Sequence, residues 1–225
     1  LAKIPLLTRE DIDKKAETFF WTEKEEDGIK VLHHNFFTSG IGYLKILFNT
    51  NVLPQEDLPY AGLLKSVLGS ISTEHYSYSD LTSEIHLNSG GMDFSVTSYA
   101  NLQDAEQFTG AFVASIRVLY DKLDFGFTML EEILNHSVFT DEKRLGEVIQ
   151  ETRSRARMKL ENAGHSTAVS RATSYFSATA YYNELTGGTA YYHFLEQLEK
   201  DYPAKKQEII VKLQEVSRKL FTRSN

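Results

Sequence analysis

The sequence contains no cysteine, and this absence excludes several kinds of site at once. Without a thiol, the chain cannot hold a disulfide framework, a thiolate zinc site, an iron–sulfur cluster or a cysteine nucleophile. Positive charge is also in deficit: 24 Lys and Arg stand against 31 Asp and Glu, and the formal net charge of −7 argues against binding to nucleic-acid phosphates. Aromatic side chains are plentiful, with 14 Phe and 12 Tyr in 225 residues, so the chain can bury a sizeable core without disulfides or metal.

Leader and membrane-spanning patterns are missing too. No basic stretch followed by an apolar run marks a signal peptide, and no apolar run reaches the roughly 20 residues that a membrane span needs. The first residue is Leu1, which removal of an initiator methionine does not normally leave. We therefore expect a fragment of a longer protein, and a propeptide or cloning boundary is the alternative.

Alternating apolar and polar residues predict strands in two places. Residues 29–37 are β-branched and aromatic, and the turn at 38–40 predicts a hairpin with a second strand at 41–49. The face of this second strand expected to be covered carries Gly42, Leu44, Ile46 and Phe48. The face expected to be open carries Tyr43, Lys45 and Leu47. Residues 92–97 and 112–118 alternate in the same way and predict two further strands.

Helical periodicity accounts for most of the remaining sequence. Helices are predicted over 58–68 and from a cap at Ser77 to about residue 88, and the apolar period becomes 3.6 from residue 121 onward. The order is therefore ββ, αα, ββ and then helices to the end. This order predicts an α+β fold, with an antiparallel or mixed sheet, helices packed on one face and a helical C-terminal tail.

Glycine and proline mark the expected ends of the later helices. A helix that opens at 140–143 should stop at Gly164, because glycine suits the left-handed backbone that ends many helices. A further helix is expected over 166–188. Pro203 is expected at the first turn of the last helix, where its missing N–H costs nothing.

No composition shift or low-complexity stretch divides the sequence, so a single domain over 1–225 is expected. Its parts are an N-terminal linker at 1–17, a sheet and helix core at 28–120, and a helical region at 121–225. Within the linker, Thr8 and Asp11 have the spacing that caps one short helical turn.

No catalytic or metal-binding motif is intact in the sequence. The seven histidines include no pair spaced i, i+4, and neither His-Glu-x-x-His nor His-x-x-Glu-His occurs. His33 and His34 are neighbours in a predicted strand, so they point to opposite faces and cannot share an ion. Surface histidines are the favoured interpretation, and a site assembled from distant histidines stays open as the alternative. A Gly-x-Ser-x-Gly elbow and a phosphate-binding glycine loop are also missing.

A basic run, Arg153, Arg155, Arg157 and Lys159, invites a nucleic-acid hypothesis. Helical spacing argues against it, since Glu151 precedes Arg155 by four residues and Glu161 follows Arg157 by four. We expect a face of internal ion pairs.

An aromatic cluster flanks the Gly187-Gly188 pair. Its members are Tyr175, Phe176, Tyr181, Tyr182, Tyr191, Tyr192 and Phe194. Helix–helix core and an interface or wet cavity wall are equally good interpretations, because tyrosine joins an apolar ring to a polar tip.

Several stretches together resemble one protein family. They are residues 28–34 (GIKVLHH) with Phe37 and Thr38, 90–92 (GGM), 139–144 (FTDEKR), 153–158 (RSRARM), 164–165 (GH), and 187–188 (GG) with 192–195 (YHFL). Each is weak alone, but in this order they cover nearly the whole chain. The chain resembles the pitrilysin/insulinase superfamily of zinc metallopeptidases, in its presequence-protease branch, and there the first domain of the non-catalytic C-terminal half.

The resemblance implies a place in a larger enzyme. Such enzymes form two bowls of two domains each, which close over a peptide, and only the N-terminal bowl carries the zinc motif His-x-x-Glu-His. In this chain Ala61 stands for the first histidine of that motif, Leu64 for the general-base glutamate and Lys65 for the second histidine, while Glu151 stands near the third ligand. An alanine, a leucine and a cation cannot bind zinc or polarise water. The expected catalytic and metal residues of this chain are therefore none.

The resemblance also implies a function. We expect a non-catalytic domain of a zinc metalloendopeptidase that degrades peptides and forms part of its closed substrate chamber. The alternative is an inactive peptide-binding or assembly module of the same fold. The expected partners are the remaining domains of the same polypeptide and a peptide substrate, with neither nucleic acid nor membrane. The chain itself should need no cofactor, and zinc is expected in the N-terminal half of the parent. The expected location is a bacterial cytoplasm or an organelle matrix.

Overall fold

The structure is a computed structural model that describes residues 8–12, 14–15, 18–104 and 107–225. The chain divides after Ser39 into a small and a large compact unit. The small unit contains a short 3-10 turn, η1 (Arg9–Asp11), and a hairpin of β1 (Thr22–Glu26) and β2 (Ile29–His33).

Sequence reasoning about the small unit is right for its turn and wrong for its hairpin. Thr8 donates from its backbone N to Asp11 Oδ2 at 2.7 Å, which confirms the predicted cap. Strand β2 pairs with β1, however, and does not form a hairpin with residues 41–49. The reason is the turn at Asp27 and Gly28, which both have positive φ, 52° and 81°. Asp-Gly with this backbone is a strong hairpin signal, and it joins β2 to the segment before it.

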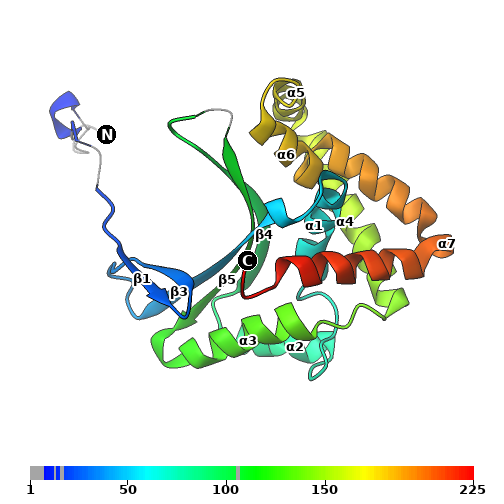
Figure 1. Ribbon diagram of the computed structural model, residues 1–225, viewed down its shortest axis with the longest axis horizontal. Helices are drawn as coiled ribbons and strands as arrows, with labels where there is room; N and C mark the ends of the chain where they lie inside the picture. Colours follow the sequence, from blue (N-terminus) through cyan, green and yellow to red (C-terminus); the bar gives the residue numbers. More distant parts are fainter. Residues whose placement is uncertain (1–7, 13, 16–17, 105–106) are drawn as a thin grey trace, which may run out of the picture. The chain divides into compact units, whose positions relative to one another are not determined.

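A three-stranded antiparallel sheet organises the large unit (Figure 1). Its order is β3 (Ile41–Asn49), β5 (Phe108–Leu119) and β4 (Met92–Ala100), so the last strand in sequence lies in the middle. The predicted strands at 41–49, 92–97 and 112–118 are confirmed, and β4 and β5 extend beyond them.

One face of this sheet is covered and the other is open, as the alternation predicts. On the covered face Phe48 lies opposite Phe112 in the register of β3 and β5, and Phe112 is fully buried. On the open face the side chains of Tyr43 and Leu47 are 58% and 49% exposed. The assignment of the two faces of β3 is therefore confirmed.

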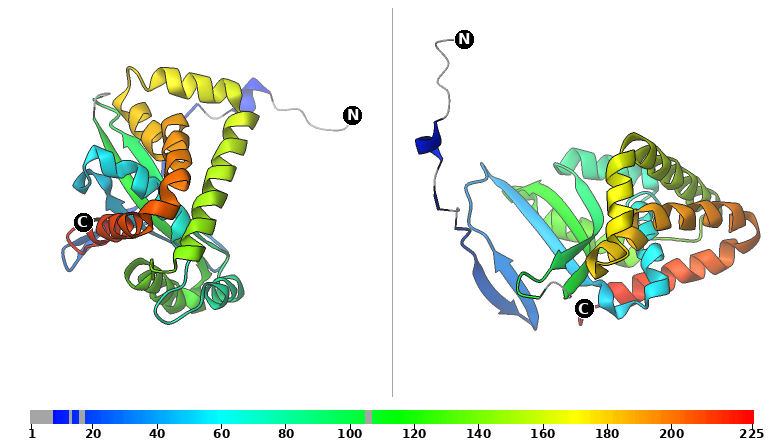
Figure 2. Two further views of the ribbon diagram at one scale, coloured as in Figure 1. Left: turned by 90° about the vertical axis from the view of Figure 1, so that its right-hand side faces the viewer. Right: turned by 90° about the horizontal axis from the view of Figure 1, so that it is seen from above.

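Helices account for the rest of the large unit. They are α1 (Leu58–Val67), α2 (Tyr78–Asn88), α3 (Leu123–His136), α4 (Glu142–Asn162), α5 (Gly164–Thr173), α6 (Ala178–Gly187) and α7 (Thr189–Leu220). Short 3-10 turns, η2 (Thr50–Val52), η3 (Gln55–Asp57) and η4 (Tyr120–Lys122), connect them to the strands. The helices gather on one side of the sheet, and α4 lies beside α7 (Figures 1 and 2). The fold is α+β with a long helical C-terminal segment, as predicted.

Three helix boundaries differ from expectation. Gly164 begins α5 and has no positive φ, so it does not stop α4 in the predicted way. The expected helix at 166–188 is two helices, because Ser177 accepts from the backbone N of Ala180 and starts α6 afresh. Pro203 lies inside α7, and the helical backbone is interrupted at Lys205, where φ is −121° and ψ is 22°. Proline removes an intrahelical donor, which explains a kink near this point.

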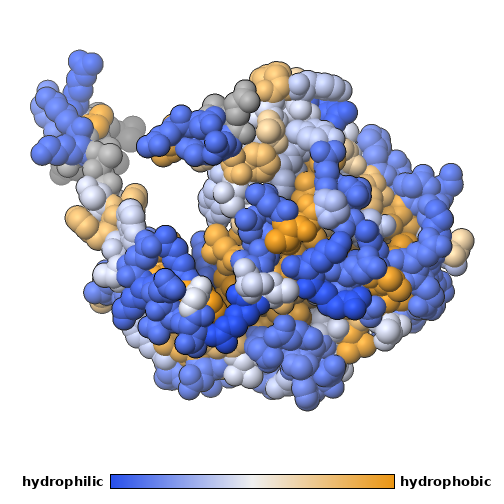
Figure 3. All heavy atoms as spheres, in the orientation of Figure 1, coloured by the Kyte–Doolittle hydropathy of each residue, from blue (hydrophilic) through white to orange (hydrophobic). Residues whose placement is uncertain are grey.

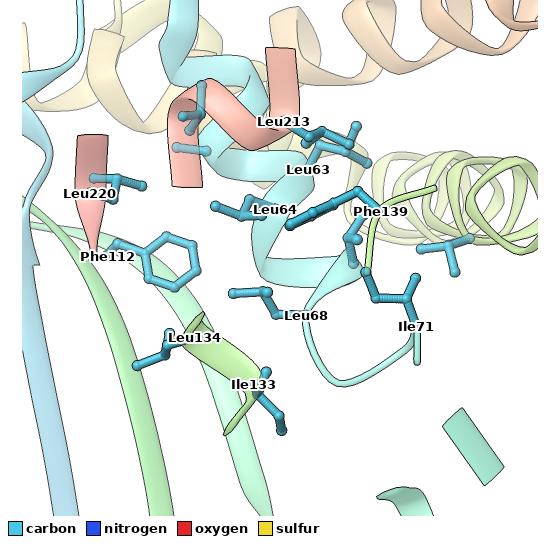
Figure 4. Packing of buried hydrophobic residues seen from close by; sticks show 14 of the residues in the cluster. Leu63, Leu64, Leu68, Ile71, Phe112, Ile133, Leu134, Phe139, Leu213 and Leu220 are labelled. Atoms are coloured by element: carbon cyan, nitrogen blue, oxygen red, sulfur yellow. The ribbon is translucent and has the colours of Figure 1, made fainter. Parts of the chain in front are cut away.

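The hydrophobic core lies between the covered face of the sheet and the helices. Leu63 and Leu64 of α1 point into it, toward Leu213 of α7 and Phe112 of β5 (Figure 4). Hydrophilic side chains predominate on the helical surface seen in Figure 3, with apolar side chains exposed between them. Among the described residues, no helix is both long and apolar enough to cross a membrane.

Candidate functional site

The positions that would carry a zinc motif lie on α1, the central helix of the core. Pro59 occupies the first turn of this helix, and α1 packs against α4, α6, α7 and β4. Ala61 and Leu64 are both fully buried, so the core, not solvent or substrate, surrounds them. Neither side chain has a lone pair for a metal, and the helix is used here for packing.

Lys65, the expected counterpart of the second histidine, has a structural role. Its Nζ donates a hydrogen bond to the Thr186 carbonyl oxygen at 3.1 Å and lies 5.5 Å from the centre of the Tyr191 ring. Burial lowers the pKa of Lys65, helped by repulsion from Lys159 and opposed by Asp93. Thr186 belongs to the last turn of α6, where a cation stabilises the negative end of the helix dipole.

Tyr191 completes this contact between three helices. Its hydroxyl donates to the Gly62 carbonyl oxygen at 2.8 Å, and burial raises the pKa of the phenol. A Cβ on Gly62 would lie 2.8 Å from the Thr186 carbonyl oxygen and 2.9 Å from Tyr191 Cε2. Helices α1, α6 and α7 therefore approach as closely as a glycine allows beside the degenerate motif.

Glu151, the residue expected near the third zinc ligand, forms an ion pair on the protein surface. It lies on α4 with an exposed side chain and forms an ion pair with Arg155. The four motif-related positions thus offer a buried methyl, a buried isobutyl group, a bonded ammonium and a paired carboxylate. This set has no nucleophile and no open metal position.

Three of the four cations of the basic run on α4 form ion pairs, and two of these pairs are the ones that the spacing predicts. Arg157 Nε lies 2.8 Å from Glu161 Oε1 on the same helix. Arg153 Nε lies 3.1 Å from Glu199 Oε2 on α7, a partner that spacing along one helix could not reveal. The interpretation as an ion-paired face is confirmed.

The aromatic cluster divides between the two interpretations left open for it. Tyr182 and Tyr191 are core residues, each 4% exposed. Tyr175 and Phe176, between α5 and α6, are instead 76% and 81% exposed. The exposed pair lies in the short break between α5 and α6, whereas the buried pair lies on α6 and α7.

Sequence reasoning did not anticipate a groove of about 420 Å³ beside the kink of α7. Its lining residues are Tyr60, Phe194, Gln197, Leu198, Asp201, Lys205, Glu208, Ile209 and Lys212. The rings of Tyr60 and Phe194 meet edge to face, with centroids 4.9 Å apart. Its charges are balanced, with two acids and two lysines, so it shows no electrostatic preference for a ligand.

Comparison of the sequence with known proteins identifies its family. The model of the family "Peptidase M-16C associated" matches residues 1–198. Protein HypA of Clostridium perfringens is 37% identical over the whole chain, which covers 23% of that protein. Presequence protease 1, chloroplastic/mitochondrial, of Arabidopsis thaliana is 27% identical over 98% of the chain and 20% of its own length. The chain therefore spans about a fifth of the length of these relatives.

A solved structure supports the fold alone. The crystal structure of a conserved protein from Enterococcus faecalis V583 matches 76% of this chain and 41% of its own, with a TM-score of 0.52 and 16% identity. The family match covers most of the sequence, and the predicted resemblance to the non-catalytic part of a pitrilysin-type peptidase is confirmed. The chain belongs to the peptidase M-16C associated family.

Proposed function

We propose that the chain is a non-catalytic domain of a zinc metalloendopeptidase that degrades peptides, and that it forms part of the wall of a closed substrate chamber. Membership of a peptidase-associated family supports the link to proteolysis. The degenerate motif on α1 supports the non-catalytic role, because Ala61, Leu64 and Lys65 provide neither zinc ligands nor a base. Zinc would be held by the N-terminal half of the parent.

The open face of the β3–β5–β4 sheet is the observation that carries the chamber role. Helices cover the opposite face, yet Tyr43 and Leu47 remain about half exposed on this one. Lys45 lies between them, and Arg117 of β5 is paired with Tyr43 in the register. Large apolar side chains beside cations suit a surface that holds an extended peptide in a sheltered space.

The hairpin of the small unit supports a partner within the same polypeptide. Every residue of β1 and β2 is exposed, and a two-stranded hairpin is at best marginally stable by itself. Trp21 and Phe37 nearby are 57% and 96% exposed. Since the relatives are about five times as long as the chain, the remaining domains of the parent are the proposed cover for this surface.

The proposed location is a bacterial cytoplasm or an organelle matrix. Among the relatives, HypA is bacterial and the Arabidopsis protein is named chloroplastic/mitochondrial. Identification of the parent gene, with an upstream His-x-x-Glu-His, would separate a peptidase from the alternative of a free-standing binding module.

The test of the chamber role uses the intact parent polypeptide and a quenched fluorescent peptide. Leu47→Ala on the open sheet face should lower kcat/KM by about tenfold, the lower end of the roughly 10- to 200-fold effect of losing an apolar contact, because Leu47 is 49% exposed. Leu87→Ala is the matched control, since Leu87 is 79% exposed on α2 and lies outside that face. Equal kcat/KM for the parent and both variants would contradict a substrate-facing role for the sheet.

A second experiment tests closure. The N-terminal half, expressed alone, should be nearly inactive, and addition of the complete C-terminal half should restore cleavage as its concentration rises. The tether normally supplies an effective concentration on the order of millimolar, so high concentrations are needed. Full activity of the N-terminal half alone would contradict the proposal.

A further inference from the structure

Two histidines and three glutamates gather where the loop before α2 meets the end of α3. They are Glu74, His75, Glu131, Glu132 and His136. The backbone joins the two segments, since Glu74 N donates to the His136 carbonyl oxygen at 2.9 Å and Thr73 forms a β-bridge with Ser137. Residues about 60 positions apart in the sequence are thereby held side by side.

The scaffold under this cluster is rigid. Ile71, just before the loop, is 1% exposed, and Ile133 of α3 is fully buried. Both point into the packed interior shown in Figure 4. Side chains supported in this way are held near one geometry, as a ligand site requires.

His136 has a carboxylate at each ring nitrogen. Nδ1 lies 3.0 Å from Glu74 Oε2, and Nε2 lies 3.3 Å from Glu131 Oε1. When Nδ1–H donates to Glu74, Nε2 presents its lone pair toward Glu131. A histidine oriented by a carboxylate behind it is the usual arrangement of a metal-ligating imidazole.

Glu132 is the buried member of the cluster. Its side chain is 8% exposed, and Oε2 lies 2.9 Å from His75 Nδ1. Oε1 accepts from the His75 backbone N at 3.3 Å. The Thr73 side chain makes a third hydrogen bond to this carboxylate. A carboxylate has about four lone-pair positions, so these three contacts orient Glu132 and leave about one position for a cation.

We propose that this cluster is a Zn²⁺ site, with His136 Nε2 and the carboxylates of Glu131 and Glu132 as protein ligands and water as the fourth. Ligand atoms of these three residues lie within 4.8 Å of one another. A tetrahedral zinc needs them about 3.4 Å apart, given bonds of about 2.0–2.2 Å. His136 Nε2 and Glu131 Oε1 already have this separation, at 3.3 Å, and the Glu131 side chain, which is 56% exposed, can rotate toward Glu132.

Zinc fits this donor set better than the other common divalent ions. An imidazole nitrogen with carboxylates suits Zn²⁺, whereas Mg²⁺ and Ca²⁺ prefer oxygen ligands alone. Glu74 and His75 orient the ligands from behind. The bound ion joins residues of α3 and reinforces the loop contact, so its role is structural and independent of the proposed chamber function.

The experiment uses the 225-residue chain, freed of metal with a chelator and titrated with ZnCl₂ by calorimetry. We expect one saturable site that Glu131→Gln and His136→Asn abolish. Glu74→Gln should weaken it about 10- to 100-fold, the usual effect of losing an orienting partner. His165→Asn, a change of an exposed histidine on α5, should leave affinity and stoichiometry unchanged.

Two further measurements keep the outcome decisive if His136→Asn destabilises the chain. Glu131 is exposed, so Glu131→Gln should fold normally by circular dichroism and still lose the site. The ¹⁵N chemical shift of the His136 Nε2 should move on addition of Zn²⁺ but not of Mg²⁺. Absence of a saturable site, or unchanged binding in Glu131→Gln, would overturn the proposal and leave an ion-pair cluster without metal.

Discussion

Lys65 Nζ donates to the Thr186 carbonyl oxygen at 3.1 Å, so this side chain caps the C-terminal end of the neighbouring helix α6. The contact explains how a cation is tolerated on the central helix of the core. Its charge is directed to the C-terminal end of α6, where the helix dipole is negative. Lys65 therefore has a structural role in the contact between α1 and α6.

Replacement of Lys65 should change how stability depends on pH. Burial lowers the pKa of Lys65 from 10.5, so the unfolded chain binds the proton more tightly than the folded chain. Between the folded and unfolded pKa values of Lys65, the stability of the unsubstituted chain should therefore rise with pH. Lys65→Met lacks this contribution. Urea unfolding from about pH 8 to the unfolded pKa of 10.5 should show the unsubstituted chain gaining stability relative to Lys65→Met.

Lys45→Met is the control for this comparison, since Lys45 is an exposed residue of the open sheet face. This variant measures how much of any pH dependence comes from the loss of one surface charge. If the free energy of unfolding varies with pH in the same way for Lys65→Met and the unsubstituted chain, the ammonium of Lys65 is not destabilised by burial.

Gly62 should tolerate no side chain. A Cβ there would lie 2.8 Å from the Thr186 carbonyl oxygen, which is backbone and cannot rotate away. We expect Gly62→Ala to lower the free energy of unfolding by about 1–3 kcal/mol through overpacking. Gly164→Ala, with nothing within 4 Å of the added Cβ, should be neutral or slightly stabilising. Denaturant unfolding of both variants measures the difference, and equal stability would disprove the close approach.

Phe48 should contribute more to stability than its strand neighbour Tyr43. Phe48 packs edge to face against Phe221, with ring centroids 4.9 Å apart, and lies on the covered face. Phe48→Ala should cost about 3 kcal/mol, the lower end of the usual range, because the ring is only partly buried. Tyr43→Ala, on the open face, should cost much less. Thermal melts of the two variants test this, and a larger loss for Tyr43→Ala would reverse the assignment of the faces.

Local signals explain which parts of the fold the sequence predicts. Alternation in 41–49 and the cap at Ser77 are properties of neighbouring residues, and the structure confirms both. The β1–β2 hairpin differs from the predicted one because two turn signals compete, Asp27-Gly28 before residues 29–37 and the Gly-containing turn at 38–40 after them. Burial of each residue on a strand follows from its neighbours, but strand pairing depends on the whole chain.

The motif positions on α1 and the histidine–glutamate cluster also differ in how far sequence reasoning can reach them. The expected alignment of Ala61, Leu64 and Lys65 with a zinc motif depends on a short local spacing, which a sequence can show. The histidine–glutamate cluster has no such spacing, since Glu74 and His136 are 62 residues apart. The bridge between Thr73 and Ser137 brings its parts together in the folded chain. Sequence reasoning could leave a long-range histidine site open but could not name its members.

Asp57 should anchor the second half of α7. Its side chain is fully buried, with Lys212 Nζ 2.6 Å from Oδ1 and Lys219 Nζ 3.4 Å from Oδ2. Asp57→Asn keeps the shape but removes the charge, and we expect a loss of about 1.5–3 kcal/mol, the usual contribution of hydrogen bonds to charged groups. Glu161→Gln, which breaks a pair exposed on both sides, should change stability little.

The pH dependence of the same anchor should be opposite in sign to that of Lys65. A hydrogen bond to Asp57 raises the pKa of Lys212 above 10.5, so its stabilisation is complete below that pH and is lost as pH rises through the higher folded value. As pH rises, the unsubstituted chain should therefore lose stability relative to Lys212→Met. Relative to Lys65→Met it should gain stability. A double-mutant cycle of Asp57→Asn and Lys212→Met, measured by urea unfolding at about pH 8, should give a coupling energy that shrinks at about pH 11. Additive effects at both pH values would show that the two side chains do not stabilise the helix as a pair.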